Sequence, residues 1–330
     1  MLVSTVVLVL VGVAAGVRGA GGTAPAGGTA PPRTAVPFAL PAGWSLSTPA
    51  AVDQAADAGV RTAINYGEPP TPDSDLGRAL ARRQMRVISG EPSSLVSALQ
   101  CARTWTVTPP PDGTPNSYCT EYAPYSEDQL VADVRAVVRR DAGNPLIAGY
   151  WILDDVSPYD HGGLVRALER VRAEIPRDRP ALCGFAAVST PDTDWDVGVA
   201  ENYSPAACDV VAPYVYPEPR PPEDPPHAAD YTMTETLPTL TRALVERGWQ
   251  PEEKPLVGVA QAWYGTRARD GEVLDVLTAA QMREQAAAYC AAGAAGIAWY
   301  AWEITAWPTA TTPATSPDLA AGVATAPGAC

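Results

Sequence analysis

Eight short apolar segments recur along the chain, and most of them are followed by a segment whose apolar residues have helical spacing. This alternation predicts parallel strands that are joined by right-handed helical crossovers. Eight is the number of strands that closes such a sheet into a barrel. We therefore expect an α/β fold of the (β/α)8 TIM-barrel type.

The expected strands are mostly apolar runs of five to eight residues, at 42–47, 60–65, 85–89, 147–153, 181–188, 209–216, 256–263 and 296–302. The expected helices lie at 49–58, 75–84, 126–140, 163–175, 236–247, 278–292 and 317–326. Ser126 and Gln129 have the spacing of a capping box. Segment 93–125 reads as a helical start and a long loop, and a disulfide would favour an ordered lid there. An irregular connection is expected through Trp195 and Tyr203.

The structural alternative is a doubly wound open sheet, which requires a Gly-rich nucleotide-binding turn after its first strand. Gly43 and Trp44, followed by Pro49, do not form such a turn. By length alone, 330 residues fit either one domain of roughly 250 residues with extensions or two ordinary domains. The strand count favours one barrel domain, which we place at residues 36–330.

An uncharged, mostly apolar run occupies residues 2–17, before Arg18 and a tract rich in Gly, Ala, Thr and Pro. The run is shorter than the roughly 20 residues of a membrane-spanning helix, so it predicts a secretory signal peptide. We assign residues 1–20 to the signal peptide and 21–35 to a flexible low-complexity spacer. The sequence allows two cleavage sites for the signal peptide, one near Ala15 and one near Ala20. The mature protein is expected to be secreted, with no stable membrane insertion.

Six cysteines follow this leader, an even number that fits disulfides in an oxidising compartment. Many pairings are possible, and the expected elements favour Cys101 with Cys119, Cys183 with Cys208, and Cys290 with Cys330. A zinc site is the competing interpretation, but the chain has no CxxC motif and only two histidines, His161 and His227. We expect no metal and no other cofactor.

The formal net charge is −14, from 37 acidic and 23 basic residues, and Lys254 is the single lysine. This acidic balance argues against nucleic acid as a partner, because few groups are available to neutralise a row of phosphates. It also disfavours anionic membrane surfaces. We expect a monomer.

In a TIM barrel the active site lies at the carboxyl ends of the strands. The strand-like run 147–153 ends in two adjacent carboxylates, Asp154 and Asp155. Other acidic, amide and aromatic candidates at expected strand ends are Asn65, Glu68, Glu91, Tyr214, Tyr216, Gln261, Trp263, Trp302 and Glu303. Carboxylates serve as acid, base or nucleophile in glycoside hydrolysis, and aromatic rings stack on sugar faces. The set therefore points to a carbohydrate ligand.

Four segments resemble those of secreted glycoside-hydrolase-like TIM-barrel proteins. They are GYWILDD at 149–155, CDVVAPYVYP at 208–217, VAQAWYG at 259–265 and AAGIAWYAW at 294–302. In those proteins strand four often ends in Asp-Glu-Pro, strand six in a Tyr-Pro turn, strand seven in Gln followed by aromatics, and strand eight in a Tyr-x-Trp-like run. The resemblance covers about residues 42–305 and implies a barrel that acts on a carbohydrate.

The chain departs from those proteins at two places. Asp155 and Val156 follow Asp154 where such relatives carry Glu and Pro, and strand seven ends in the amide Gln261 where many retaining glycosidases carry their nucleophile. A two-carboxylate mechanism must therefore recruit another acid, and Glu303 at the end of strand eight is the preferred one.

We expect Asp155 to be the general acid/base. A separation from Glu303 of roughly 5 Å would imply retention of configuration, and one of roughly 6.5 to 9.5 Å inversion. In an alternative, Asp154 instead of Glu303 is the partner of Asp155 and holds it protonated, since two close like charges raise one pKa. Glu91 is the reserve acid. The residues expected to contact substrate are Asn65, Glu91, Tyr214, Tyr216, Gln261, Trp263 and Trp302.

Each candidate also has a structural interpretation. Asp154 and Asp155 would then cap the following turn, Glu303 would pair with an arginine, Gln261 would be a structural amide, and the aromatic residues would pack the rim. His161 and His227 fall in expected loops, and the sequence offers no support for Ser-His-Asp chemistry.

The leading hypothesis is a secreted glycoside hydrolase-like protein that cleaves a polysaccharide or glycoconjugate by a two-carboxylate mechanism. The alternative is a catalytically inactive carbohydrate-binding or cell-envelope module on the same barrel, which the missing strand-seven acid favours. An acyl or ester hydrolase is a third and weaker hypothesis, because no nucleophile elbow is recognisable.

Overall fold

The computed structural model describes residues 42–44, 46–107, 124–154, 163–186, 188–190, 193–196, 198–217, 233–266, 273–304 and 309–329. The predicted signal peptide and spacer lie outside these residues. So do several individual residues named above, which are Cys119, Asp155, Val156, His161, His227 and Cys330.

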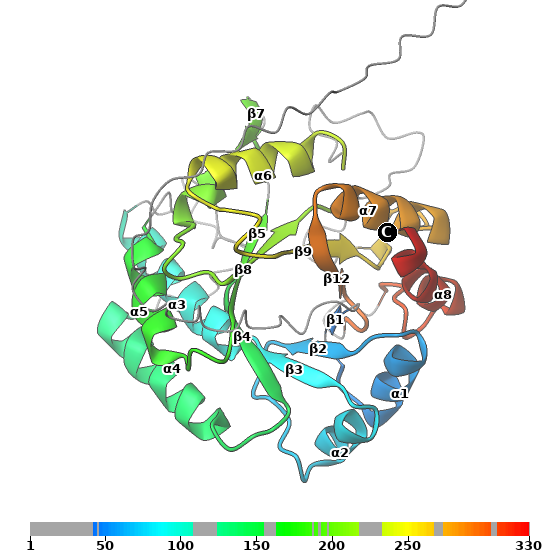
Figure 1. Cartoon of the computed structure of the whole chain (residues 1–330), viewed down its shortest axis with the longest axis horizontal. Coiled ribbons are helices and arrows are strands. Elements are labelled where there is room, and N and C mark those ends of the chain that lie inside the picture. Colours follow the sequence, from blue (N-terminus) through cyan, green and yellow to red (C-terminus); the bar gives the residue numbers. More distant parts are fainter. Residues whose placement is uncertain are drawn as a thin grey trace, which may run out of the picture. The chain divides into compact units, whose positions relative to one another are not determined.

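Parallel strands close into a barrel within the described part of the chain (Figure 1). Its strands are β1 (Ala42–Trp44), β2 (Thr62–Asn65), β3 (Arg86–Ser89), β4 (Ile147–Leu153), β5 (Ala181–Ala186), β8 (Val210–Tyr214), β9 (Leu256–Gln261) and β12 (Ala294–Tyr300). β1 pairs in parallel with both β2 and β12, which closes the barrel. The predicted (β/α)8 TIM-barrel fold is confirmed.

The helices lie around the outside of this barrel (Figure 1). They are α1 (Pro49–Asp57), α2 (Asp75–Arg82), α3 (Glu91–Val107), α4 (Glu127–Asp141), α5 (Val165–Glu174), α6 (Thr236–Glu246), α7 (Ala279–Ala291) and α8 (Pro317–Thr325). The capping box predicted at the start of α4 is present, since the Ser126 hydroxyl accepts from the Gln129 N–H and the Gln129 side chain accepts from the Ser126 N–H. Thr278 and Gln281 form a second one at α7.

Two short hairpins and two 3₁₀ turns depart from the sequence-based expectations. The connection through Trp195 contains the antiparallel strands β6 (Val188–Thr190) and β7 (Thr193–Asp196), and then the 3₁₀ helix η1 (Gly198–Asn202). The expectation of an irregular connection there was wrong. Strands of three or four residues are too short for the alternation of apolar and polar residues to mark them.

The second hairpin, β10 (Gly265–Thr266) with β11 (Val273–Leu274), lies beyond the end of β9, and a 3₁₀ turn η2 (Ala326–Ala329) follows α8. The two-residue strands are too short to show alternation, and a four-residue 3₁₀ turn is too short to show helical periodicity. Neither contributes a strand to the barrel.

The apolar core has two layers. One lies between the barrel and the helices and includes Leu80 of α2, Val134 of α4 and Phe185 of β5, each at most 1% exposed. The other fills the barrel interior, where Ile64 of β2 and Trp151 of β4 are fully buried. Two layers of this kind are what inward- and outward-facing residues of a closed barrel produce.

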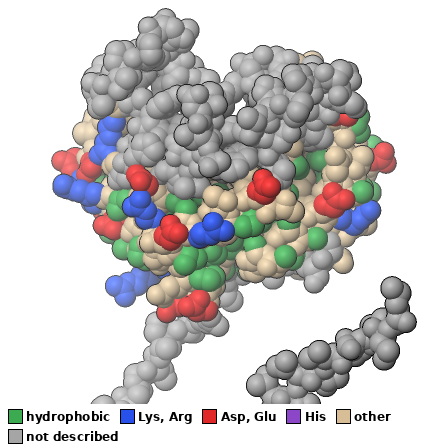
Figure 2. All heavy atoms as spheres, turned by 90° about the horizontal axis from the view of Figure 1, so that it is seen from above, with side chains coloured by type: hydrophobic (Ala, Val, Ile, Leu, Met, Phe, Trp, Pro, Cys, Tyr) green, Lys and Arg blue, Asp and Glu red, His purple; other side chains and the backbone are tan. Residues whose placement is uncertain are grey.

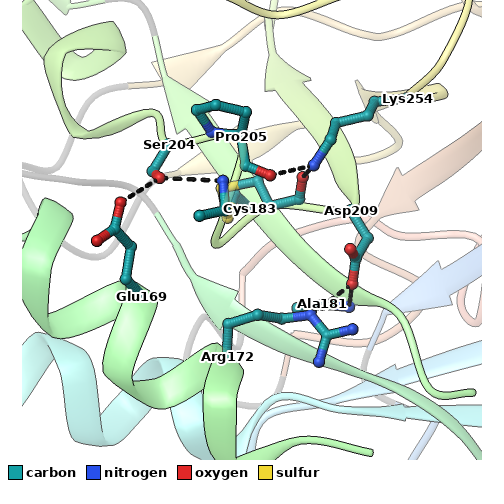
Figure 3. Close-up of a disulfide and its surroundings, with 10 residues drawn as sticks. Glu169, Arg172, Ala181, Cys183, Ser204, Pro205, Asp209 and Lys254 are labelled. Atoms are coloured by element: carbon teal, nitrogen blue, oxygen red, sulfur yellow. Dashed lines mark hydrogen bonds and ion pairs between the residues drawn. A yellow bond between two sulfur atoms is a disulfide. The ribbon is translucent and has the colours of Figure 1, made fainter. Parts of the chain in front are cut away.

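A disulfide joins Cys183 of β5 to Cys208, just before β8, with a Cα–Cα distance of 5.6 Å (Figure 3). This predicted bond is confirmed. Cys101 and Cys290 are also in disulfides, and the partners predicted for them lie outside the described residues. Beside the Cys183–Cys208 bond, the Lys254 ammonium donates to the carbonyl of Cys208 at 2.6 Å and to that of Pro205.

Acidic and basic side chains are interspersed on the face drawn in Figure 2. Ion pairs join neighbouring helices, such as Arg135 of α4 with Glu174 of α5 at 2.8 Å and Arg170 of α5 with Asp128 of α4 at 2.6 Å. Among the helices described, none is both long and apolar enough to cross a membrane.

Candidate functional site

Asp154 follows β4 and is directed into the barrel mouth by an irregularity in that strand. Tyr150 and Ile152 pack toward the helices, whereas Trp151 packs inside the barrel. Leu153 breaks this alternation, because it also packs toward the helices, and the pairing of β4 with β5 shifts register between Trp151 and Leu153. Such a shift turns the next side chain to the other face. It places Asp154 where residues of other strand ends can contact it.

Two tyrosines from different strands bind the Asp154 carboxylate. The hydroxyl of Tyr214, the last residue of β8, donates a hydrogen bond to Asp154 Oδ1. Tyr66, the residue after β2, also forms a side-chain hydrogen bond with Asp154. Strand ends that are far apart in sequence are thus joined at one carboxylate.

Further aromatic rings extend this contact across the mouth. The Tyr214 ring lies edge-on to Trp151 at 6.1 Å and edge-on to Tyr216 at 6.0 Å. Tyr216 in turn stacks on Tyr300, the last residue of β12, with ring centroids 5.9 Å apart and planes 19° from parallel. We call Tyr66, Tyr214, Tyr216 and Tyr300 the tyrosine cluster. It connects the end of β4 to the end of β12.

The electrostatics of the cluster follow from burial and from the charge of Asp154. Burial, and then the negative charge of Asp154, raise the pKa of Tyr66 well above 10.0. The pKa of Tyr214 is raised for the same two reasons, in the same order. Both phenols are therefore neutral hydrogen-bond donors at any physiological pH.

Gly184 of β5 provides the space for Tyr214. A Cβ atom at Gly184 would lie 2.5 Å from Cε2 of the Tyr214 ring and 3.1 Å from both the Leu153 carbonyl oxygen and the Trp151 ring. Any larger residue would displace the ring that donates to Asp154. A glycine in a strand interior marks such a close approach.

Glu303, the predicted second carboxylate, lies three residues after Tyr300. Its Oε2 accepts from the backbone N–H and the hydroxyl of Ser47, both at 2.8 Å. These bonds tie the end of β12 to the loop between β1 and α1. Within the part of the chain that the structure describes, the hydrogen bonds to the Glu303 carboxylate are made at Oε2.

Glu91 stands two residues after the end of β3 and is the first residue of α3, where its side chain contacts the helix layer. Two guanidinium nitrogens of Arg140 bind its carboxylate at 2.6 and 3.2 Å. Arg140 also lies 3.0 Å from Asp141 and 4.0 Å from Glu68. Glu68 and Arg140 line a small pocket of about 170 Å³ between the β2–α2 loop and the end of α4.

Three further candidates are fully packed. Trp263 and Trp302 are at most 1% exposed. Gln261 is 0% exposed, and its amide nitrogen donates to the Trp263 carbonyl at 2.9 Å. Asn65 ends β2 and its carbonyl accepts from the Gly90 N–H at 2.6 Å. The predicted ligand contacts of these residues stay predictions.

Sequence reasoning named Tyr214 and Tyr216 but missed Tyr66 and Tyr300. Tyr66 stands one residue beyond the expected strand end, and Tyr300 stands within the Tyr-x-Trp-like run of strand eight, so both carried a positional signal. Among the described residues, no group of three or more His, Cys, Asp or Glu side chains is arranged to hold a metal ion.

No protein-family model matches the chain, and no curated protein matches it in sequence. Its structure is similar to a protein described as a glycoside hydrolase, with a TM-score of 0.53 and 13% identity over 87% of this chain and 68% of that one. A chitinase from Chromobacterium violaceum aligns with a TM-score of 0.49 and 13% identity, over 86% of this chain and 98% of that one.

An endo-β-1,3-glucanase from Pseudomonas viridiflava aligns with a TM-score of 0.41 and 14% identity, over 80% of this chain and 86% of that one. The match with a TM-score of 0.53 shows a similarity of fold alone. The chain therefore shares its TIM-barrel fold with a protein described as a glycoside hydrolase.

Proposed function

We propose that the protein binds a carbohydrate at the carboxyl-terminal mouth of its barrel and hydrolyses a glycosidic bond there. The observation that carries this proposal is the Asp154 carboxylate, bound by phenol hydroxyls and bordered by the tyrosine cluster. Aromatic rings pack against the apolar C–H faces of sugars, and carboxylates accept hydrogen bonds or protons from them. The fold shared with a glycoside hydrolase supports the same proposal.

In this proposal the neighbouring carboxylates have separate roles. Asp155 is the general acid/base, and the charge of Asp154 favours the protonated form of its neighbour. Glu303 is the second carboxylate. Ser47 holds its Oε2 in place, and Oε1 would be the atom that accepts a proton from water or attacks the sugar.

A secreted protein that acts on a polysaccharide or glycoconjugate fits the remaining features. The Cys183–Cys208 disulfide supports an oxidising compartment, and the apolar run at residues 2–17 supports export. The proposal needs no cofactor, because carboxylates alone perform this chemistry.

The test compares three variants, Asp155→Asn, Glu303→Gln and Asp154→Asn, on soluble β-glucan, chitin and xylan oligosaccharides. Loss of the acid/base in Asp155→Asn should lower kcat by at least about 100-fold, while the variant folds and still binds the oligosaccharide. Asp178→Asn is the matched control, because Asp178 is exposed and precedes β5 at the other end of the strand. Unimpaired turnover by Asp155→Asn would remove that residue from the mechanism.

One observation favours a second candidate function, a carbohydrate-binding barrel without catalysis. The end of β9 carries the buried amide of Gln261 and no carboxylate. Saturable binding of an oligosaccharide by the wild type, with no release of reducing ends after prolonged incubation, would favour this candidate over hydrolysis.

A further inference from the structure

The backbone hydrogen bonding between β8 and β9 is irregular next to Tyr214, which belongs to the candidate site. The Val211 N–H makes an ordinary rung of this ladder, at 3.0 Å. Two residues later Pro213 has no N–H to donate. The following rung, from the Val215 N–H to the Val259 carbonyl, is stretched to 3.5 Å. The backbone on both sides of Tyr214 is therefore weakly held on its β9 side, while β5 pairs with Pro213 and Tyr214 on the other side.

The hydroxyl of Tyr289, on α7, lies at this weak place. It accepts from the Val215 N–H at 3.0 Å and donates to the Val259 carbonyl at 2.7 Å. The Pro213 carbonyl is also within reach, at 3.1 Å. Tyr289 is fully buried, so no water competes for these bonds. The Tyr289 hydroxyl thus links the Val215 N–H to the Val259 carbonyl, whose direct hydrogen bond is long.

The surrounding residues are shaped for this insertion. A Cβ atom at Gly258 of β9 would lie 2.3 Å from the Tyr289 ring, so glycine is needed for the ring to lie there. One helical turn before Tyr289, and hence on the same face of α7, the Gln285 amide bonds both the N–H and the carbonyl of Gln261, at 2.8 and 3.2 Å. Two side chains of α7 thus hold the ends of β8 and β9.

We propose that Tyr289 is a positioning residue of the candidate site. Its hydroxyl fixes residues 213 and 215 and thereby holds the Tyr214 hydroxyl on Asp154. This assignment rests on the proposed function for its consequence on catalysis, but the positioning itself can be measured in the free protein.

The test replaces Tyr289 by Phe, which keeps the ring and removes the hydroxyl. Tyr203→Phe is the matched control, because Tyr203 is only 4% exposed and its hydroxyl has no hydrogen-bond partner within the described residues. The two variants make the same chemical change at two buried positions. Only one of them should disturb the site.

The direct readout is NMR of the full chain with [13Cζ]tyrosine, in which the Tyr214 resonance is assigned by its absence from Tyr214→Phe. In Tyr289→Phe we expect this resonance to shift and to titrate at lower pH than in the wild type, because Tyr214 loses its fixed contact with Asp154. In Tyr203→Phe it should stay unchanged. An unchanged Tyr214 resonance in Tyr289→Phe, or an equal shift in the control, would overturn the proposal.

The kinetic readout uses whichever of the soluble glucan, chitin or xylan oligosaccharides the wild type cleaves. A loss of alignment should lower kcat about tenfold with a smaller change in KM, at a temperature where all variants are folded. If the wild type neither binds nor cleaves any oligosaccharide, the proposed function fails, and the Tyr214 resonance still decides whether Tyr289 positions that side chain.

Discussion

Asp154 and Glu91 were both candidates for one site, yet they occupy two different environments. Asp154 receives hydrogen bonds from phenols at the barrel mouth. Glu91 lies in the helix layer, and the guanidinium of Arg140 neutralises it. Burial, and then the negative charge of Asp154, raise the pKa of both Tyr66 and Tyr214.

The difference teaches how a strand-end acid becomes available for chemistry. A carboxylate paired with arginine is part of the scaffold, because its charge is already compensated. A carboxylate held by neutral donors is oriented but keeps its charge for a ligand or a neighbouring acid. Position in the sequence alone does not distinguish the two cases.

The largest effect in this comparison is expected from Gly184→Ala. The new methyl group would lie 2.5 Å from the Tyr214 ring, so the ring must leave its place beside Asp154. The free energy of unfolding should fall by about 1 to 3 kcal/mol, and oligosaccharide binding should be lost. Denaturant unfolding and titration calorimetry measure the two effects.

The control for this prediction is Gly143→Ala, where a Cβ atom would meet nothing within 4 Å. Retention of both stability and binding in Gly184→Ala would mean that the mouth tolerates a displaced Tyr214. The hydrogen bond from Tyr214 would then not explain how Asp154 differs from Glu91.

A smaller effect is expected from alkaline pH. Tyr66 and Tyr214 have a pKa raised above 10.0 by burial and by Asp154, whereas tyrosines of the unfolded chain ionise near pH 10. Their contribution to stability is therefore complete below about pH 10 and declines as pH rises, by up to about 1.4 kcal/mol per pH unit for each tyrosine. Urea unfolding between pH 8 and pH 11 measures it. The decline should be shallower in Tyr214→Phe, and an identical decline would contradict the assignment.

The smallest effect is expected from Glu91→Gln. The side chains of Glu91 and Arg140 are 26% and 36% exposed, so solvent screens their ion pair. Its loss should cost no more than about 1 kcal/mol of the free energy of unfolding and should leave turnover unchanged. A strong loss of turnover without loss of stability would return Glu91 to the site as the reserve acid.

Much of the fold could be predicted from local signals. Apolar runs, capping residues such as Ser126, and Gly or Pro stops marked the barrel strands and the helices around them, because these elements are long enough to show their periodicity. The hairpin β6–β7 escaped prediction because its strands have three and four residues. Its formation depends on pairing within a connection and not on burial of a long apolar face.

The candidate site could be predicted only in outline. The strand-four acids were found from their position, but the direction of the Asp154 side chain depends on the register shift between Trp151 and Leu153, which is a property of strand pairing. The role of Glu91 depends on Arg140, which is 49 residues away in sequence. Neither contact has a local sequence signal, so both required the three-dimensional arrangement.

The Cys183–Cys208 disulfide also determines how readily the connection between β5 and β8 can accept changes in length. It closes a loop over a sequence separation of 25 residues, which contains β6, β7 and η1. Since the entropic cost of closing a flexible loop grows only with the logarithm of its length, lengthening this one adds about 0.6 kcal/mol for each doubling. The segment between β5 and β8 can therefore accept inserted residues at the rim of the barrel while the pairing of β5 with β8 is retained.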